Sequence, residues 1–195
     1  MHAFFRSAGA VVMILVLLGG VSALGYDRWT SPISEGDRLV AEGRLEEALA
    51  SYAEAEARFD KFPALKQFVP SEYSHVMANE LWILYRLGKY DELIDRAARA
   101  PETAMPHFWV GCAFFEKGKA EQKPEARTGW LSRSEEELRR AVEGEPEDWD
   151  AKFDFELVTR LSAELKKQPK TPPQQLMQLL RPQPKPGAKP VKRVG

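Results

Sequence analysis

The chain has 195 residues, of which 44% are hydrophobic and 29% are charged, and its formal net charge is −1. This composition is ordinary for a folded domain, and it argues against nucleic acid as the main partner because phosphate binding requires a basic excess. The single cysteine, Cys112, excludes an internal disulfide and a cysteine-based metal cage.

The N-terminus carries a long uncharged segment. No Asp, Glu, Lys or Arg occurs in residues 7–26, and a helix of 20 residues rises about 30 Å, the thickness of a bilayer hydrocarbon core. Arg6 and the terminal amine precede this segment, so the positive-inside rule keeps the N-terminus cytoplasmic. We therefore expect residues 1–28 to be a signal-anchor that crosses the inner (cytoplasmic) membrane once. The C-terminal domain would then face the periplasm or exterior.

Two other interpretations of this segment stay open. The first is a cleaved signal peptide, since Val21-Ser22-Ala23 resembles a small-x-small cleavage site. The second is burial inside the folded domain, which is disfavoured because the segment is apolar all round and has no polar face. Both the anchor and the signal peptide export the rest of the chain.

The next segment has the spacing of two amphipathic helices joined by a glycine turn. Gly36 and Ala48 are small where the two helices would cross closely, and Gly43 supplies the positive φ that ends the first helix. Apolar residues fall on the facing stripes at helical spacing. Pro32 and its neighbours predict that the first helix begins near Ile33.

The same spacing returns twice further along the chain. A second unit runs through Leu81 and the turn glycine Gly88, and a third contains Gly118 as its predicted turn. Because the three turn glycines are 45 and 30 residues apart, we expect degenerate repeats with insertions near 60–72 and 119–131.

A last helix is predicted from Trp149 to about Lys167. A lone final helix of this kind covers the apolar face that the last repeat of a solenoid leaves exposed. The acidic run Glu135-Glu136-Glu137 is expected to be the solvated opening turn of a helix, stabilised by the helix dipole.

This pattern resembles the tetratricopeptide repeat (TPR), a helix pair of about 34 residues. The stretch PEDWDAKFDFEL at 146–157 is more narrowly similar to small membrane-anchored TPR proteins encoded beside MoxR-type ATPases and von Willebrand A-domain proteins, of the methanol-dehydrogenase-maturation or aerotolerance type. In it, Phe153, Asp154 and Phe155 replace the Tyr, Asn and Leu of those proteins. The resemblance implies an accessory role in assembling or maturing an envelope complex, with von Willebrand A-domain or other envelope proteins as partners.

We therefore predict an all-α chain. An N-terminal transmembrane helix is followed, over residues 29–167, by a short TPR-like α-solenoid of about three degenerate helix pairs and a final capping helix. A Pro/Lys-rich, largely disordered tail occupies residues 168–195. The alternative is a helical bundle without repeats.

The tail differs from the rest of the chain in charge. Residues 168–195 contain six Lys/Arg, seven Pro and no Asp/Glu, which leaves 22 basic and 29 acidic residues, a net charge of −7, in residues 1–167. Residues 172–181 have the capping pattern of a short helix, which would fold back onto the last repeat or dock on a partner. Four later basic residues would contact anionic lipid or stay solvated: Lys185, Lys189, Lys192 and Arg193.

The TPR resemblance also implies a partner-binding groove along the first helices of the repeats. The matching positions here are aromatic rather than cationic, so they favour an apolar or helical guest segment; the alternative is that several of them belong to the core. The candidates are His75, Trp82, Tyr85, Arg86, Met105, Phe108, Cys112, Phe115, Glu116, Phe153 and Arg160.

No catalytic motif occurs in the sequence, and the three histidines lack a metal-ligand spacing. We therefore expect a non-catalytic membrane-anchored scaffold or adaptor for protein–protein interaction, without metal, cofactor or small-molecule substrate. One alternative is a permanent structural subunit of a larger membrane assembly. Another is a small thiol enzyme that uses Cys112.

Overall fold

The computed structural model describes residues 2–167, which fold into helices without a strand. The all-α prediction is confirmed for these residues. The tail at 168–195, with the helix predicted at 172–181, lies outside them. The helices are α1 (His2–Ala41), α2 (Leu45–Lys61), α3 (Leu65–Phe68), α4 (Pro70–Arg86), α5 (Tyr90–Ala97), α6 (Ala104–Ala120), α7 (Pro124–Gly144) and α8 (Trp149–Lys167).

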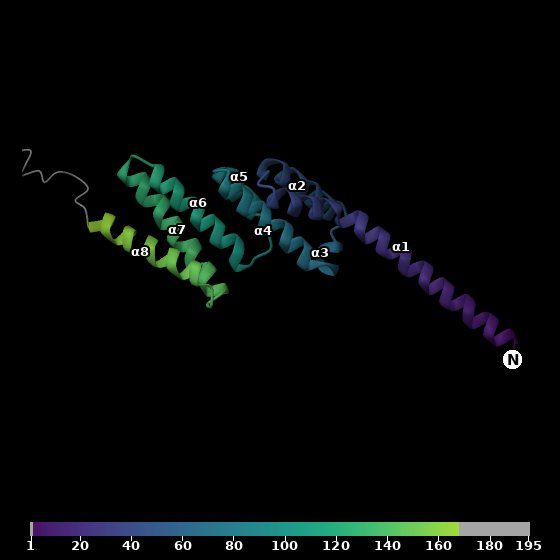
Figure 1. The fold of residues 1–195 in the computed structure, drawn as a ribbon. Helices are drawn as coiled ribbons and strands as arrows, with labels where there is room; N and C mark the ends of the chain where they lie inside the picture. The colour runs from purple at the N-terminus through teal and green to yellow at the C-terminus, as the bar shows by residue number, and fades with distance from the viewer. Residues whose placement is uncertain (1, 168–195) are drawn as a thin grey trace, which may run out of the picture.

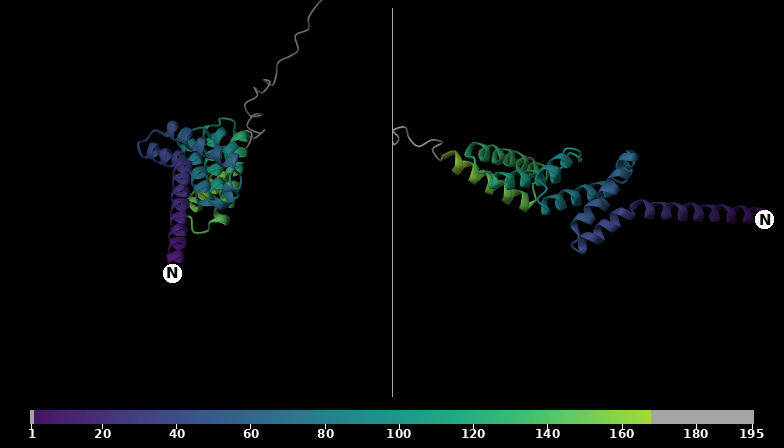
Figure 2. Two further views of the ribbon diagram at one scale, coloured as in Figure 1. Left: turned by 90° about the vertical axis from the view of Figure 1, so that its right-hand side faces the viewer. Right: turned by 90° about the horizontal axis from the view of Figure 1, so that it is seen from above.

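The helices pack in a row that follows the chain (Figure 1). The C-terminal part of α1 packs against α2, α2 against α4, α4 against α5 and α6, α6 against α7, and α7 against α8. The N-terminal part of α1 projects away from the row (Figures 1 and 2). In the part of the chain that the structure describes, no helix combines the length and the apolarity that crossing a membrane requires.

The helix α1 continues through Pro32, so the helix start predicted just after this proline is wrong. Proline has no N–H to donate to the carbonyl of Arg28, four residues earlier. That carbonyl instead accepts hydrogen bonds from Ser31 Oγ and from Arg58 Nη1, both at 2.8 Å. Arg58 also donates to the carbonyl of Trp29 at 2.7 Å. The carbonyl left without a helical donor by the proline is thus satisfied, and the last turn of α2 is tied to α1 where α1 changes direction (Figure 2).

Two of the three predicted turn glycines are at helix ends. Gly43 and Gly88 follow α1 and α4 with φ of 76° and 70°. The prediction for Gly118 is wrong, because this residue lies inside α6, where an added Cβ would come 3.1 Å from Leu131 Cδ2 of α7. The insertion predicted at 119–131 is not a loop either. Three residues connect α6 to α7, and most of the inserted residues lengthen α7 at its start.

Small residues bring α6 and α7 close together. A Cβ on Gly111 would lie 2.6 Å from Leu138 Cγ, well inside van der Waals contact. Ala104, Gly111 and Gly118 are spaced seven residues apart, about two helical turns, so they form one stripe on the face of α6 that meets α7.

A buried charge cluster joins α2, α4 and α5. The carboxylates of Glu56 and Glu80 both accept hydrogen bonds from Arg96 Nη1, at 2.8 Å for Glu80 Oε1. The other oxygen of Glu80, which is fully buried, has no hydrogen-bond partner. Burial raises the pKa of Glu80 to about 7. Glu80 is therefore an ionisable residue within the core.

Candidate functional site

An apolar cleft opens between α6 and α8, next to the C-terminal end of α4. Its inner part is a cavity of about 80 Å³, and its outer part is a hollow of about 360 Å³ that adjoins the cavity at Phe115. We call the two parts together the α6/α8 cleft. The cavity is lined by Tyr85, Cys112, Phe115, Glu116, Leu138, Asp154, Leu157 and Val158, and the hollow by Phe115, Gly118, Lys119, Arg127, Leu131, Leu161, Glu164 and Leu165.

One face of α8 lines the whole length of the cleft. Asp154, Leu157, Leu161 and Leu165 recur at spacings of three and four residues, which places them on the same side of a helix. They span 11 residues, or about 16 Å. The cleft is therefore long enough for about three turns of a guest helix.

A thiol and a carboxylate meet in the cavity. Cys112 Sγ lies 3.6 Å from Asp154 Oδ2, and it is the only hydrogen-bond donor to Asp154 among the described residues. Burial, with Asp154 nearby, raises the pKa of the Cys112 thiol far above its ordinary value, and burial also raises the pKa of Asp154. The thiol therefore stays protonated at neutral pH and donates to the carboxylate. A protonated, buried thiol is a poor nucleophile.

Two further polar groups border the cavity. Burial raises the pKa of Tyr85 to about 12, so its phenol remains a neutral hydrogen-bond donor at physiological pH. Glu116 is bound by Lys119, which lies 2.8 Å away in the next turn of α6. Among the described residues, Asp154 is thus the carboxylate of the cavity that has no cationic partner.

The structure brings several of the predicted groove residues together in this cleft. Tyr85, Cys112, Phe115 and Glu116 line the cavity. Phe108 packs against the same apolar cluster, beside Trp109, with the two ring centroids 4.9 Å apart.

Other predicted residues lie outside the cleft and contact neighbouring helices. His75 Nε2 donates to Asp37 Oδ1 of α1 at 2.7 Å. Trp82 is packed on the core between α1, α2 and α4, and the guanidinium of Arg86 lies 5.6 Å from its ring centroid. Met105 packs between this core and the one around α5.

The two candidates on the last helix do not line the cleft. Phe153 is 68% exposed, and Arg160, seven residues later on the same face, is exposed and paired with Glu156. The residues of α8 that line the cleft lie about 40° to 120° further round the helix than Phe153. Sequence reasoning missed Asp154, Leu157, Leu161 and Leu165, although the leucines at four-residue spacing were a readable signal.

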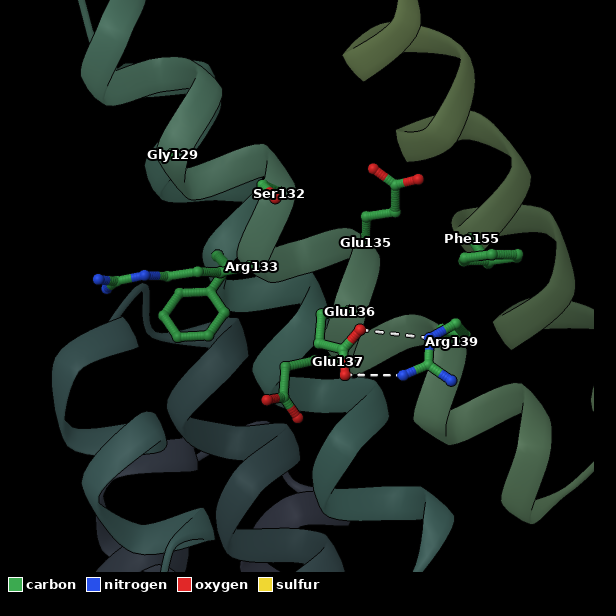
Figure 3. A pocket seen from close by; sticks show the side chains of 9 residues that line it. Gly129, Ser132, Arg133, Glu135, Glu136, Glu137, Arg139 and Phe155 are labelled. Atoms are coloured by element: carbon green, nitrogen blue, oxygen red, sulfur yellow. Dashed lines mark hydrogen bonds and ion pairs between the residues drawn. The ribbon is translucent and has the colours of Figure 1, made fainter.

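A larger hollow of about 800 Å³ lies over the outer face of α7, with Phe155 of α8 at one side (Figure 3). The predicted opening turn at 135–137 is wrong, since these glutamates lie in the middle of α7. Glu136 is bound by Arg139 at 2.7 Å, and Glu137 accepts a hydrogen bond from His107 Nδ1 at 2.7 Å. Because these carboxylates already have partners on a shallow, charged surface, the α6/α8 cleft is the better candidate for binding.

Comparison of the chain with family models, with curated proteins and with solved structures finds no match.

Proposed function

We propose that this chain is a non-catalytic, membrane-anchored scaffold or adaptor of the TPR type, which binds a protein partner during assembly or maturation of a cell-envelope complex. The observation that carries the proposal is the α6/α8 cleft, an apolar trough left open beside a row of paired helices. Pairs of helices stacked in this way use the face of their first helices to bind polypeptide segments.

The contacts within the pairs support the TPR assignment. A Cβ on Gly36 of α1 would come 2.8 Å from the ring of Tyr52 in α2, so a small residue faces a large one in the first pair. Gly111 faces Leu138 in the same way in the pair of α6 and α7. In the pair of α4 and α5 the sizes are reversed, because the positions that match Gly36 and Tyr52 hold Leu81 and Ala97.

The shape of α1 supports the membrane anchor. Its N-terminal part, which contains the uncharged residues 7–26, projects from the row of helices (Figure 1). The apolar side chains of Met13 and Leu24 are exposed on it. An uncharged helix with exposed apolar side chains is suited to lipid, and we propose a single crossing of the inner membrane with residues 29–167 on the periplasmic side.

The chemistry of the cleft defines the guest. Aromatic and leucine side chains line it, so the guest presents an apolar face over about three helical turns. Asp154 has only a weak thiol donor, so a guest group that donates a hydrogen bond, such as Lys, Arg or an amide, would complete its coordination.

The test is whether truncation of side chains inside the cleft weakens binding of the partner. Phe115→Ala and Leu157→Ala remove rigid apolar contacts, and we expect each to weaken partner binding roughly tenfold. Phe153→Ala removes an exposed aromatic ring of the same helix that lies outside the cleft, and it serves as the matched control. The full chain is purified from its native membrane, and the co-purifying protein is quantified by mass spectrometry beside circular dichroism of the chain.

Retention of the same protein by all three variants would refute the cleft as the binding site. The stoichiometry of the wild type separates the two candidate functions. A scaffold that binds transiently yields the chain alone as a stable monomer under stringent washing, whereas a permanent structural subunit co-purifies in a fixed ratio with its assembly.

A further inference from the structure

The connection between α2 and α4 exposes two phenylalanines. Phe62 directly follows α2 and is 52% exposed, and Phe68 ends the short helix α3 and is 80% exposed. We call residues 62–69 the α2–α4 connection. It lies in the first of the insertions that the sequence predicts, and the cleft does not use it.

Both ends of this connection are tied to the same part of α1. On the α2 side, Arg58 donates to the carbonyls of Arg28 and Trp29. On the α4 side, Glu72 Oε1 accepts a hydrogen bond from the Tyr26 hydroxyl at 2.6 Å. The two flanks of the connection are therefore tied to α1 where the uncharged segment ends, and Figure 1 shows α3 at the end of the row from which α1 projects.

Both phenylalanines lie about one helical turn, in sequence, from a residue that is tied to α1. Phe62 follows Arg58, which binds the carbonyls of Arg28 and Trp29, by four residues. Phe68 precedes Glu72, which binds the Tyr26 hydroxyl, by four residues. The anchoring contacts of both phenylalanines are thus with residues 26–29, directly after the last turn of residues 7–26 in which Leu24 is exposed.

We propose that the α2–α4 connection lies on the surface of the lipid bilayer, with Phe62 and Phe68 inserted at the boundary between headgroups and acyl chains. This inference rests on the membrane anchor of the proposed function. Apolar aromatic side chains insert at this depth, and Tyr prefers the same interface, where Tyr26, the last residue of the uncharged segment, is half exposed. Lys61, which is exposed next to Phe62, can place its ammonium among anionic headgroups while its stem stays on apolar surface.

Lipid is the occupant rather than a second protein because the exposed phenylalanines flank the residues that follow the proposed anchor. The exposed side chains of Leu24, Phe62 and Phe68 lie at one end of the row, beside the segment that would itself be in lipid. Two attachments, the anchor and the connection, would fix the tilt of the domain and hold the α6/α8 cleft, at the other end of the row, away from the membrane.

The test is the depth of a nitroxide label in the full chain. In a Cys112→Ala background, single cysteines are placed by Ala64→Cys in the connection, Met13→Cys in the uncharged segment and Phe153→Cys on α8. The protein is reconstituted in vesicles of phosphatidylcholine and phosphatidylglycerol, and collision rates with oxygen and with a water-soluble nickel chelate are measured by electron paramagnetic resonance. Because oxygen concentrates in lipid, we expect the oxygen-to-nickel ratio at residue 64 to exceed that at residue 153 by roughly threefold or more.

A second variant keeps the label and removes the phenylalanines. Phe62→Ser with Phe68→Ser should return the ratio at residue 64 to the value at residue 153, while circular dichroism stays unchanged. A ratio at residue 64 that equals the one at residue 153 in the parent chain, with residue 13 in lipid, overturns the lipid contact and leaves the anchor standing. Shielding of residue 64 from both reagents means that protein covers the connection, and it overturns the proposal. A label at residue 13 that is exposed to the nickel chelate overturns the anchor and this inference together.

Discussion

The two halves of the helix row are held together by different chemistry. In the first half, a partly buried guanidinium between two buried carboxylates joins three helices, and the ring of Trp29 meets that of Phe59 edge to face at 4.7 Å. In the second half, the stripe of Ala104, Gly111 and Gly118 lets α6 and α7 pack almost backbone to backbone. There α8 packs mainly on α7 and touches α6 only slightly.

This difference explains where the molecule is open. Large side chains and charge pairs fill the space between α1, α2, α4 and α5. Close packing of α6 on α7 leaves α8 displaced to one side, and the apolar faces of α6 and α8 then border a cleft that no described side chain fills. The first half is therefore expected to supply rigidity, and the second half to supply the binding surface.

The largest effect on stability is expected at the charge cluster of the first half. Arg96→Met leaves Glu56 and Glu80 buried without their cation, and removal of one partner from a buried ion pair costs about 3–5 kcal/mol of unfolding free energy. Thermal and denaturant unfolding of the full chain would measure the loss. Arg160→Met, which removes an exposed arginine from α8, is the control and should change stability by no more than about 0.5 kcal/mol. Equal effects at the two arginines would show that the cluster does not hold the first half together.

A smaller loss is expected at the stripe of the second half. Gly111→Ala places a Cβ 2.6 Å from Leu138 Cγ, and overpacking of this kind costs about 1–3 kcal/mol. Gly129→Ala adds the same methyl group to α7 at a position with no neighbour within 4 Å, so it should stabilise by up to about 1 kcal/mol through helix propensity. Urea unfolding distinguishes the two. If Gly111→Ala is neutral or stabilising, the close approach of α6 and α7 is not as described.

The charge cluster also predicts a pH dependence. The folded state raises the pKa of Glu80 from 4.5 to about 7, so it binds this proton more tightly than the unfolded chain does. The stabilisation from the bound proton is complete below about pH 4.5 and is lost as the pH rises to about 7, with a slope of at most about 1.4 kcal/mol per pH unit. Glu80→Gln should reduce the pH dependence of the midpoint temperature of thermal unfolding over this range. A pH profile that survives this substitution unchanged would assign the titration to another group.

Much of the fold was readable from the sequence, because the turns and stripes that define it are local. Gly43 and Gly88 ended helices as predicted, since a positive φ is a local requirement. Gly118 was misassigned because a glycine that ends a helix cannot be told, from the sequence, from a glycine that allows a second helix to pack closely. Its partner, Leu131, lies 13 residues away on another helix. The role of Glu80 depended on Arg96 and Glu56, which are remote in sequence, so no local pattern could reveal it.

The candidate site was predicted in part for the same reason. On α4 and α6, the TPR register pointed to Tyr85 and Phe115, and both line the cleft. On α8 no turn glycine follows to fix the register. An error of one residue moves a side chain by about 100° around the helix, which is the difference between the predicted Phe153 and the observed Asp154.

The central claim is that the α6/α8 cleft holds a polypeptide guest, and site-specific photo-crosslinking in the native membrane tests it most directly. A benzophenone amino acid replaces Leu157 or Leu161 in the cleft, or Phe153 or Arg160 on the exposed face of the same helix. We predict one defined protein adduct from the first two positions and none of that protein from the other two, as read by mass spectrometry. Adducts of that protein only at Phe153 and Arg160, or equally at all four positions, would contradict the account.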